Sequence, residues 1–245
     1  MKAIQADLSG AKLKGTILYE ADLTEAKLVG VNLSEANTLS LIAVGADFSR
    51  VEAHQLVLYK AKLTRALFRA ARVTASVLLE CEATEIDCGA ADFSQTAFVM
   101  TTADGANFLD ANAENIRLVQ SSFERADFRM ARMPGSNFRG AKLAGAKLTG
   151  ANLRRSDLST ADMRGVDLSR GIAVECIVMD TNLEGANLRG ANLMLAIMHR
   201  ANLRGADVSN ANLFCADLTG AEGDKKTSFA GSNVKRALVA GVFNG

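Results

Sequence analysis

The chain contains no Trp, a single Pro and no long apolar run. A membrane-spanning helix needs about 20 consecutive, predominantly apolar residues, and no such stretch occurs. The first residues, MKAIQAD, also lack the apolar core of a signal peptide, so we expect a cytoplasmic protein that does not enter a membrane. Lys and Arg number 28 against 27 Asp and Glu, and this balance gives no general attraction for nucleic acid or for an acidic membrane.

Histidine and cysteine are too sparse to indicate a reactive site. The two histidines, His54 and His199, are expected on outward positions of different faces, without metal-ligand spacing or a paired nucleophile. The four cysteines form neither a CxxC motif nor a disulfide framework, which suits a reducing compartment. We therefore predict no enzyme activity, no catalytic residue, no metal ion and no cofactor.

A five-residue repeat fills almost the whole chain. A large apolar residue recurs at almost every fifth position from Leu8 to Leu218, usually with Ala two places earlier and Asp, Asn or Lys between them. Segments 6–10 (ADLSG), 21–25 (ADLTE), 151–155 (ANLRR) and 201–205 (ANLRG) are four copies. This period fits neither an α-helix nor an ordinary strand, so it predicts a repeat architecture.

A bend after each repeat, four times, would make a square coil of about 20 residues, and such coils stack at the parallel-strand spacing of about 4.8 Å. The large apolar residue and the small residue two places earlier would point inward, giving a core of Leu and Phe with almost no polar side chains. The A-(D/N)-L-x-x pattern resembles the pentapeptide-repeat family over essentially the whole chain. That resemblance implies an all-β, right-handed quadrilateral parallel β-helix, here of about eleven coils and roughly 50 Å.

Residues 1–245 are therefore expected to form one domain with a few irregular places. Segment 221–226 uses six residues where five are expected, which predicts a one-residue register shift, after which Phe229, Val234 and Val239 take the large apolar positions. Where the large position holds a small residue, the other inward position is often larger, but two pairs lack this compensation, and we expect a small void or a pinched coil there. These pairs are Ala111 with Ala113 and Gly171 with Ala173.

Two apolar groups fall on outward positions, where contacts with partners are expected. The first, called the apolar stripe below, follows one face over six coils, although strands also tolerate such residues on exposed faces. The second, the C-terminal apolar cluster, would support a homodimer, since the resemblance implies pairing through C-terminal ends. The apolar stripe comprises Ile17, Tyr19, Leu39, Val57, Tyr59, Val77, Leu79, Val99, Met100 and Val119, and the C-terminal apolar cluster comprises Ile172, Val174, Met194, Leu195 and Phe214.

Charge is also patterned along the expected faces. Aspartate precedes the large residue in every second coil of one face, which keeps like charges apart or presents an anion row to a partner. The members of this row are Asp7, Asp47, Asp87, Asp127, Asp167 and Asp207. Between Arg72 and Arg117 there is no Lys or Arg, whereas basic residues outnumber acidic ones from Arg129 to Arg170.

These features favour a non-enzymatic protein-interaction scaffold, either complete or a module of a larger bacterial protein linked to secretion or effectors. The partner is a protein that the sequence does not name. One alternative is a topoisomerase-protecting rod of the quinolone-resistance type, which the resemblance includes; the near-neutral charge speaks against it, because mimicry of DNA needs negative charge along the rod. The other is nucleic-acid binding through the basic C-terminal half, which the scarcity of aromatics disfavours.

Overall fold

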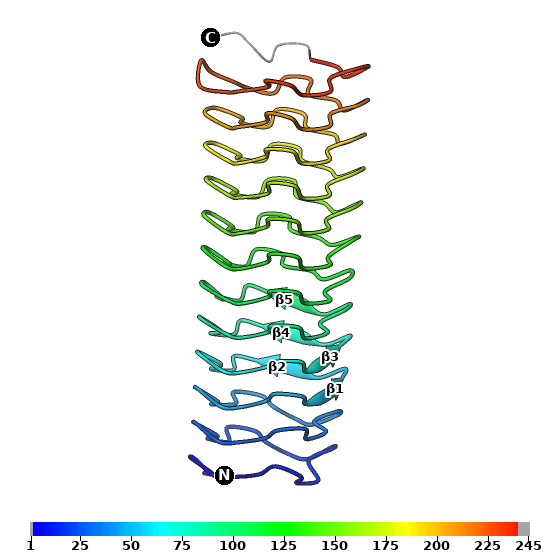
Figure 1. Cartoon of the computed structure of the whole chain (residues 1–245). Coiled ribbons are helices and arrows are strands. Elements are labelled where there is room, and N and C mark those ends of the chain that lie inside the picture. The colour runs from blue at the N-terminus through cyan, green and yellow to red at the C-terminus, as the bar shows by residue number, and fades with distance from the viewer. Residues whose placement is uncertain (1, 240–245) are drawn as a thin grey trace.

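The computed structural model describes residues 2–239, and these form a tower of stacked coils with the two ends at opposite extremes (Figure 1). Each residue that precedes a large apolar residue pairs in parallel with the residue 20 positions later, from Lys2↔Asp22 to Asn202↔Glu222. The backbone of neighbouring coils bonds in both directions, as where Leu8 N donates to Lys27 O at 2.8 Å and Lys27 N donates to Ala6 O at 2.9 Å. The fold is the expected right-handed quadrilateral β-helix.

Five short strands stand out from this continuous pattern. They are β1 (Glu52–His54), β2 (Val57–Tyr59), β3 (Arg72–Thr74), β4 (Val77–Leu79) and β5 (Ala97–Val99). β1 pairs with β3 on one face, and β2, β4 and β5 form a parallel sheet on the next face. Within residues 2–239 no helix is long and apolar enough to cross a membrane.

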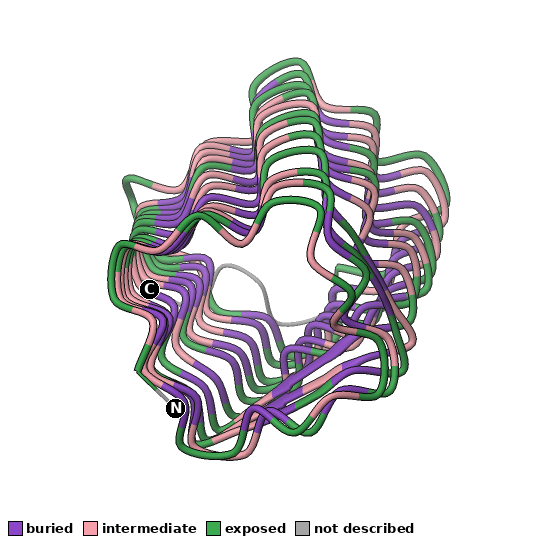
Figure 2. Ribbon diagram, turned by 90° about the horizontal axis from the view of Figure 1, so that it is seen from below, coloured by how far each residue is buried: buried purple, intermediate pink, exposed green. Residues whose placement is uncertain are grey.

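The interior is filled by the large residues of the repeat, as predicted. Buried positions of successive coils line up in rows along the tower (Figure 2). Phenylalanine dominates the middle levels, where the rings of Phe48 and Phe68 stack at 4.8 Å and those of Phe108 and Phe128 at 5.1 Å. Other rings meet edge to face, as Phe98 with Phe123 at 5.6 Å, so stacked and edge-to-face contacts together pack the middle of the core.

The prediction of a core almost without polar side chains is wrong at the small inward position. Several coils place a buried Ser or Thr there, and its hydroxyl bridges backbone groups of the preceding coil. Thr101 Oγ1 accepts from Cys81 N at 3.2 Å and donates to Leu78 O at 3.1 Å. Ser121 Oγ repeats this one coil later, accepting from Thr101 N at 3.0 Å. A hydroxyl is tolerated because the coil spacing brings a donor and an acceptor to it.

Removing one of these hydroxyls should cost stability. Thr101→Val keeps the shape of the side chain but leaves the amide of Cys81 without its hydroxyl acceptor, so we expect the free energy of unfolding to fall by about 1–3 kcal/mol. The neighbouring Thr102 is exposed, and Thr102→Val should stay within about 0.5 kcal/mol of the parent. Chemical unfolding of both variants measures the difference, and equal stabilities would contradict the role of the buried hydroxyl.

The corners of the tower depend on left-handed backbone. The last residue of nearly every repeat has a φ between about 48° and 77°, and most of these residues are not glycine. Thr160 is the single β-branched residue among these corner positions within residues 5–220. Branching at Cβ makes the left-handed region costly, so the corner selects against Val and Ile.

An exposed corner alanine tests this constraint. Ala90 has a φ of 53°, and we expect Ala90→Val to lower the free energy of unfolding by about 1 kcal/mol or more. Ala90→Gly should be close to neutral, because relief of the left-handed strain offsets the added freedom of the unfolded chain. Ala144→Val, outside the left-handed corners, is the control and should have little effect. Equal losses at positions 90 and 144 would show that the corner imposes no such cost.

The structure gives separate outcomes for the expected register shift and for the two small inward pairs. After Glu222 the pairing interval changes from 20 to 21 residues, as in Asp207↔Ser228, and Phe229 packs against the core. Val234 and Val239 are about half exposed. Of the two outcomes expected at Gly171, a void or a pinched coil, the void is absent beside the glycine, since a Cβ there would lie 2.5 Å from Leu168 Cδ1 and that leucine occupies the space. Ala111 and Ala113 are both fully buried.

Candidate interaction surfaces

The structure brings the apolar stripe together on one face. Ile17 is 79% exposed and Val57 is 54% exposed, and both belong to one column in which residues 17, 37, 57, 77 and 97 pair successively. Asn37 interrupts this column and Ala97 is buried, so the stripe narrows at those levels. Tyr19 and Met100 are about half exposed, and the other members lie half-buried, namely Leu39, Tyr59, Val77, Leu79, Val99 and Val119.

A shallow groove of about 480 Å³ lies in the middle of the stripe. Leu39, Val57, Tyr59 and Leu79 supply its apolar lining, and Asn37 and Glu80 add polar groups at its margin. The ammonium group of Lys60 lies 5.1 Å from the centre of the Tyr59 ring and 3.6 Å from Glu80. The groove therefore combines an apolar floor with one ion pair beside it, a composition suited to contact with an apolar group.

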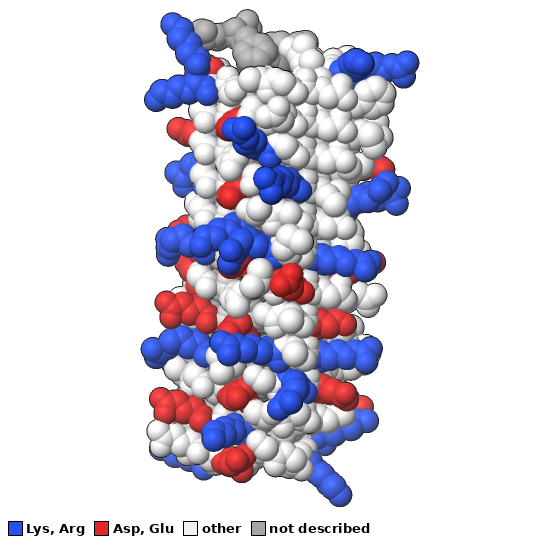
Figure 3. Space-filling model, in the orientation of Figure 1, with Lys and Arg blue, Asp and Glu red and all other residues white. Residues whose placement is uncertain are grey.

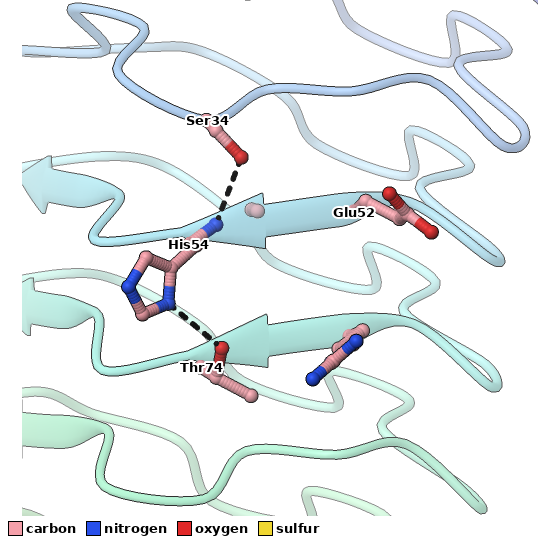
Figure 4. A pocket seen from close by; sticks show the side chains of 6 residues that line it. Ser34, Glu52, His54 and Thr74 are labelled. Atoms are coloured by element: carbon pink, nitrogen blue, oxygen red, sulfur yellow. Dashed lines mark hydrogen bonds between the residues drawn. The ribbon is translucent and has the colours of Figure 1, made fainter.

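A second hollow lies on the adjoining face, where β1 and β3 run side by side (Figure 4). The backbone N–H of His54 donates to Ser34 Oγ at 3.1 Å, and His54 Nδ1 lies 3.1 Å from Thr74 Oγ1. Glu52 points away from the histidine in this view. Within residues 2–239 no group of three His, Cys, Asp or Glu side chains is placed to hold a metal ion. The histidine thus serves as a hydrogen-bonding link between coils.

The other histidine forms a pair with a carboxylate. His199 Nε2 lies 2.7 Å from Asp217 Oδ2, and Asp217 Oδ1 accepts from the backbone N–H of Thr219 at 3.0 Å. Hydrogen bonds from the Thr219 hydroxyl, from His199 and from the Thr219 amide lower the pKa of Asp217 to about 2. The ionised carboxylate is therefore the form that the folded chain favours.

The lowered pKa of Asp217 predicts that the folded chain loses stability at low pH. Because the folded pKa of Asp217 is lowered, its contribution is complete above the ordinary pKa of 3.8 and is lost as the pH falls toward about 2. We expect Asp217→Asn to lower the melting temperature at pH 7 by about 2–4 °C and to approach the parent below that window. Thermal unfolding between pH 2 and pH 7 checks this, and a difference independent of pH would contradict it.

The aspartate row has a structural role that the sequence did not reveal. Each of its six members accepts, through Oδ1, the backbone N–H of the residue two places later, as in Asp7 with Ser9 at 3.0 Å and Asp207 with Ser209 at 2.9 Å. Most asparagines in the same repeat position make the same bond, for example Asn32 with Ser34. These side chains hold the turn, which explains why short Asp and Asn recur there.

The C-terminal apolar cluster is smaller than predicted. Val174 is only 3% exposed, so the prediction that it forms part of an accessible surface is wrong. Its neighbours 20 residues away in the column are Arg154 and Met194, and Arg154 reaches Glu175 with a 3.1 Å ion pair. These longer side chains cover the valine. The remaining members, Ile172, Met194, Leu195 and Phe214, are exposed or half-buried.

Charge is distributed without a large area of one sign on the visible side. Figure 3 shows Lys and Arg side chains along the whole length of this side, with Asp and Glu side chains between them. Over the described residues many charged side chains are paired, as in Arg129 with Asp127 at 2.6 Å and Arg200 with Asp180 at 2.6 Å. Exposed pairs of this kind add little stability and leave the surface mixed in sign.

Known proteins share this repeat. HetL, a pentapeptide repeat protein involved in heterocyst differentiation regulation from the cyanobacterium Nostoc, is 21% identical over 97% of this chain and 88% of its own, with a TM-score of 0.35. Rfr23 of the cyanobacterium Cyanothece is 27% identical over 48% of this chain and 90% of its own, with a TM-score of 0.37. QnrB1, a plasmid-mediated fluoroquinolone resistance protein, is 20% identical over 71% of this chain and 92% of its own, with a TM-score of 0.36.

No match was found among curated protein sequences. The family model for pentapeptide repeats, in eight copies, matches residues 4–37, 104–140, 136–172, 176–213 and 199–222. These segments together cover more than half of the chain, and they leave residues 38–103 between the first match and the second. With coils that pair at an interval of 20 residues and this repeat throughout, the chain belongs to the pentapeptide-repeat family.

Proposed function

We propose that the chain is a non-enzymatic, cytoplasmic interaction scaffold of a bacterium, either complete or as a module of a larger protein. It binds a protein partner through the apolar stripe. The observation that carries this proposal is the groove between Leu39, Val57, Tyr59 and Leu79. Apolar surface gathered in one continuous, partly hollowed area is typical of contact sites on otherwise soluble rods.

The position of the stripe supports this choice. The stretch between the first and second family matches, residues 38–103, contains all five strands and most of the stripe. In this stretch Val57 and Val77 replace the turn-holding Asp or Asn, and Tyr59 and Leu79 replace the usual polar residue after the large one. The inward positions of this stretch stay buried even where the large and small residues change places, so these departures alter the surface while the coils continue.

The partner that fits is a protein segment with apolar side chains. A groove of about 480 Å³ accommodates one or two large apolar side chains, and aromatic or branched anchors commonly carry most of the energy of such contacts. Glu80 and Lys60 at its margin favour a polar or charged rim on the partner. The exposed part of the C-terminal apolar cluster is the second proposed contact, with another copy of the chain.

Site-specific photo-cross-linking in the host cells tests the stripe. A photo-reactive amino acid at position 59 should give one discrete cross-linked protein, because the Tyr59 side chain lines the groove. The same amino acid at position 139 is the matched control, since residue 139 follows the large residue on the same face four coils later. Mass spectrometry identifies the adduct, and its mass shows whether the partner is a second copy.

A charge placed in the groove should abolish the adduct. Leu79→Glu puts a carboxylate beside Tyr59 in the groove, and we expect at least a tenfold loss of cross-linking because the partner would have to bury that charge. The folded state of the variant is checked by its circular dichroism. Equal adducts from positions 59 and 139, or adducts insensitive to Leu79→Glu, would overturn the proposal.

A further inference from the structure

A third hollow lies on the face that carries the aspartate row, toward the C-terminal end. It is a groove of about 490 Å³, and its polar lining consists of Thr149, Ser169, Arg170, Asn187, Arg189 and Asn210. The two arginines come from adjacent coils, since Arg170 N donates to Arg189 O at 3.0 Å. Two guanidinium groups and several hydrogen-bonding side chains therefore share one concave site.

These arginines differ from their neighbours in having no carboxylate partner. Residues 125–204, all of which the structure describes, contain eleven arginines, and nine of them have a carboxylate oxygen within 3.9 Å. The two without such a partner in this range are Arg170 and Arg189, and both line the groove. Unpaired cations that meet in a hollow are suited to bind an anion.

The columns around the arginines explain why they remain unpaired and why the surface is hollow. Arg170 has Gly150 and Gly190 as its neighbours 20 residues away, so neither of these two positions carries a side chain. The corresponding neighbours of Arg189 are Ser169 and Ser209. No carboxylate therefore stands next to either arginine in its own column.

Two aspartates of the row lie beside the groove and affect its charge. Asp167 is already satisfied by hydrogen bonds from Thr149 Oγ1 at 2.9 Å, from Asn187 Nδ2 at 3.0 Å and from the amide of Ser169 at 3.0 Å. Asp207 accepts the amide of Ser209, and the charge of Arg189 is the smallest of the causes that lower the pKa of Asp207. Both carboxylates hold the turns that follow them, and the guanidinium groups of Arg170 and Arg189 keep their N–H donors available for a ligand.

We propose that this groove binds a phosphate monoester group. Each guanidinium offers a fork of donors, and two forks from adjacent coils match an anion with three terminal oxygens better than a carboxylate, which has two. Thr149, Asn187 and Asn210 supply further hydrogen-bonding groups around the anion. The phosphate belongs either to a small metabolite or to a phosphoserine of a protein. The site lies on a different face from the apolar stripe and does not depend on the function proposed above.

Titration calorimetry with the full chain tests this site. The probes are phenyl phosphate, a short phosphoserine peptide, benzoate as the carboxylate of similar size, and a DNA duplex. We expect phenyl phosphate to bind at least about tenfold more tightly than benzoate. Arg170→Gly and Arg189→Ser, which copy the residues of the neighbouring coils, should each weaken phosphate binding about tenfold or more.

Arg200→Gly is the matched control, because Arg200 is a corner arginine that is already paired with Asp180, and it should leave binding within about twofold of the parent. Thermal unfolding shows that each variant is folded. Similar affinity for phenyl phosphate and the peptide assigns the site to any phosphate ester, whereas a much tighter peptide assigns it to a phosphorylated protein. Phosphate binding unchanged in both Arg170→Gly and Arg189→Ser, equal binding of benzoate and phenyl phosphate, or binding of the DNA duplex alone would overturn the proposal.

Discussion

The backbone hydrogen bonds between residues 20 positions apart are the constraint on which the rest of the structure depends. Each coil is bonded to the next on all four faces, so the position of every side chain follows from its number. An extra residue changes the interval for everything after it, and the interval becomes 21 only after Glu222. Because this pairing is continuous, the core can be a set of stacked columns, in which each coil packs on the next, as where the ring of Phe108 stacks on that of Phe128.

Most polar residues of the repeat are used to make the turns. The Asp or Asn before each large residue accepts an amide two places later, and the corner residue takes the left-handed conformation. Such residues form rows that look like ligand sets in the sequence, yet nearly all of them already accept a backbone amide, with Asn112 as an exception. Functional surfaces are therefore best sought where the pattern is broken, as at Val57, or where a charged side chain has no partner, as at Arg170.

The period of five was sufficient to predict the architecture and the place where the apolar stripe lies. The period was insufficient wherever the burial or the hydrogen bonding of a side chain depends on its neighbours 20 positions away. Val174 occupies an outward position of the repeat, but the longer Arg154 and Met194 on either side cover it. The hydroxyl of Thr101 is buried because the preceding coil presents a donor and an acceptor to it, which a linear pattern does not show. The groove at Arg170 and Arg189 likewise appears only when adjacent coils are compared.

A rod of this kind holds its surface groups at fixed separations. The apolar groove lies on one face near the N-terminal half, and the arginine groove lies on another face toward the C-terminal end. Because the coils between them are continuously hydrogen-bonded, little conformational entropy is lost when either site is occupied. Two ligands bound at these sites would be kept apart at a constant distance and orientation. A stiff spacer between two partners is therefore a role that this fold can perform without moving parts or chemistry.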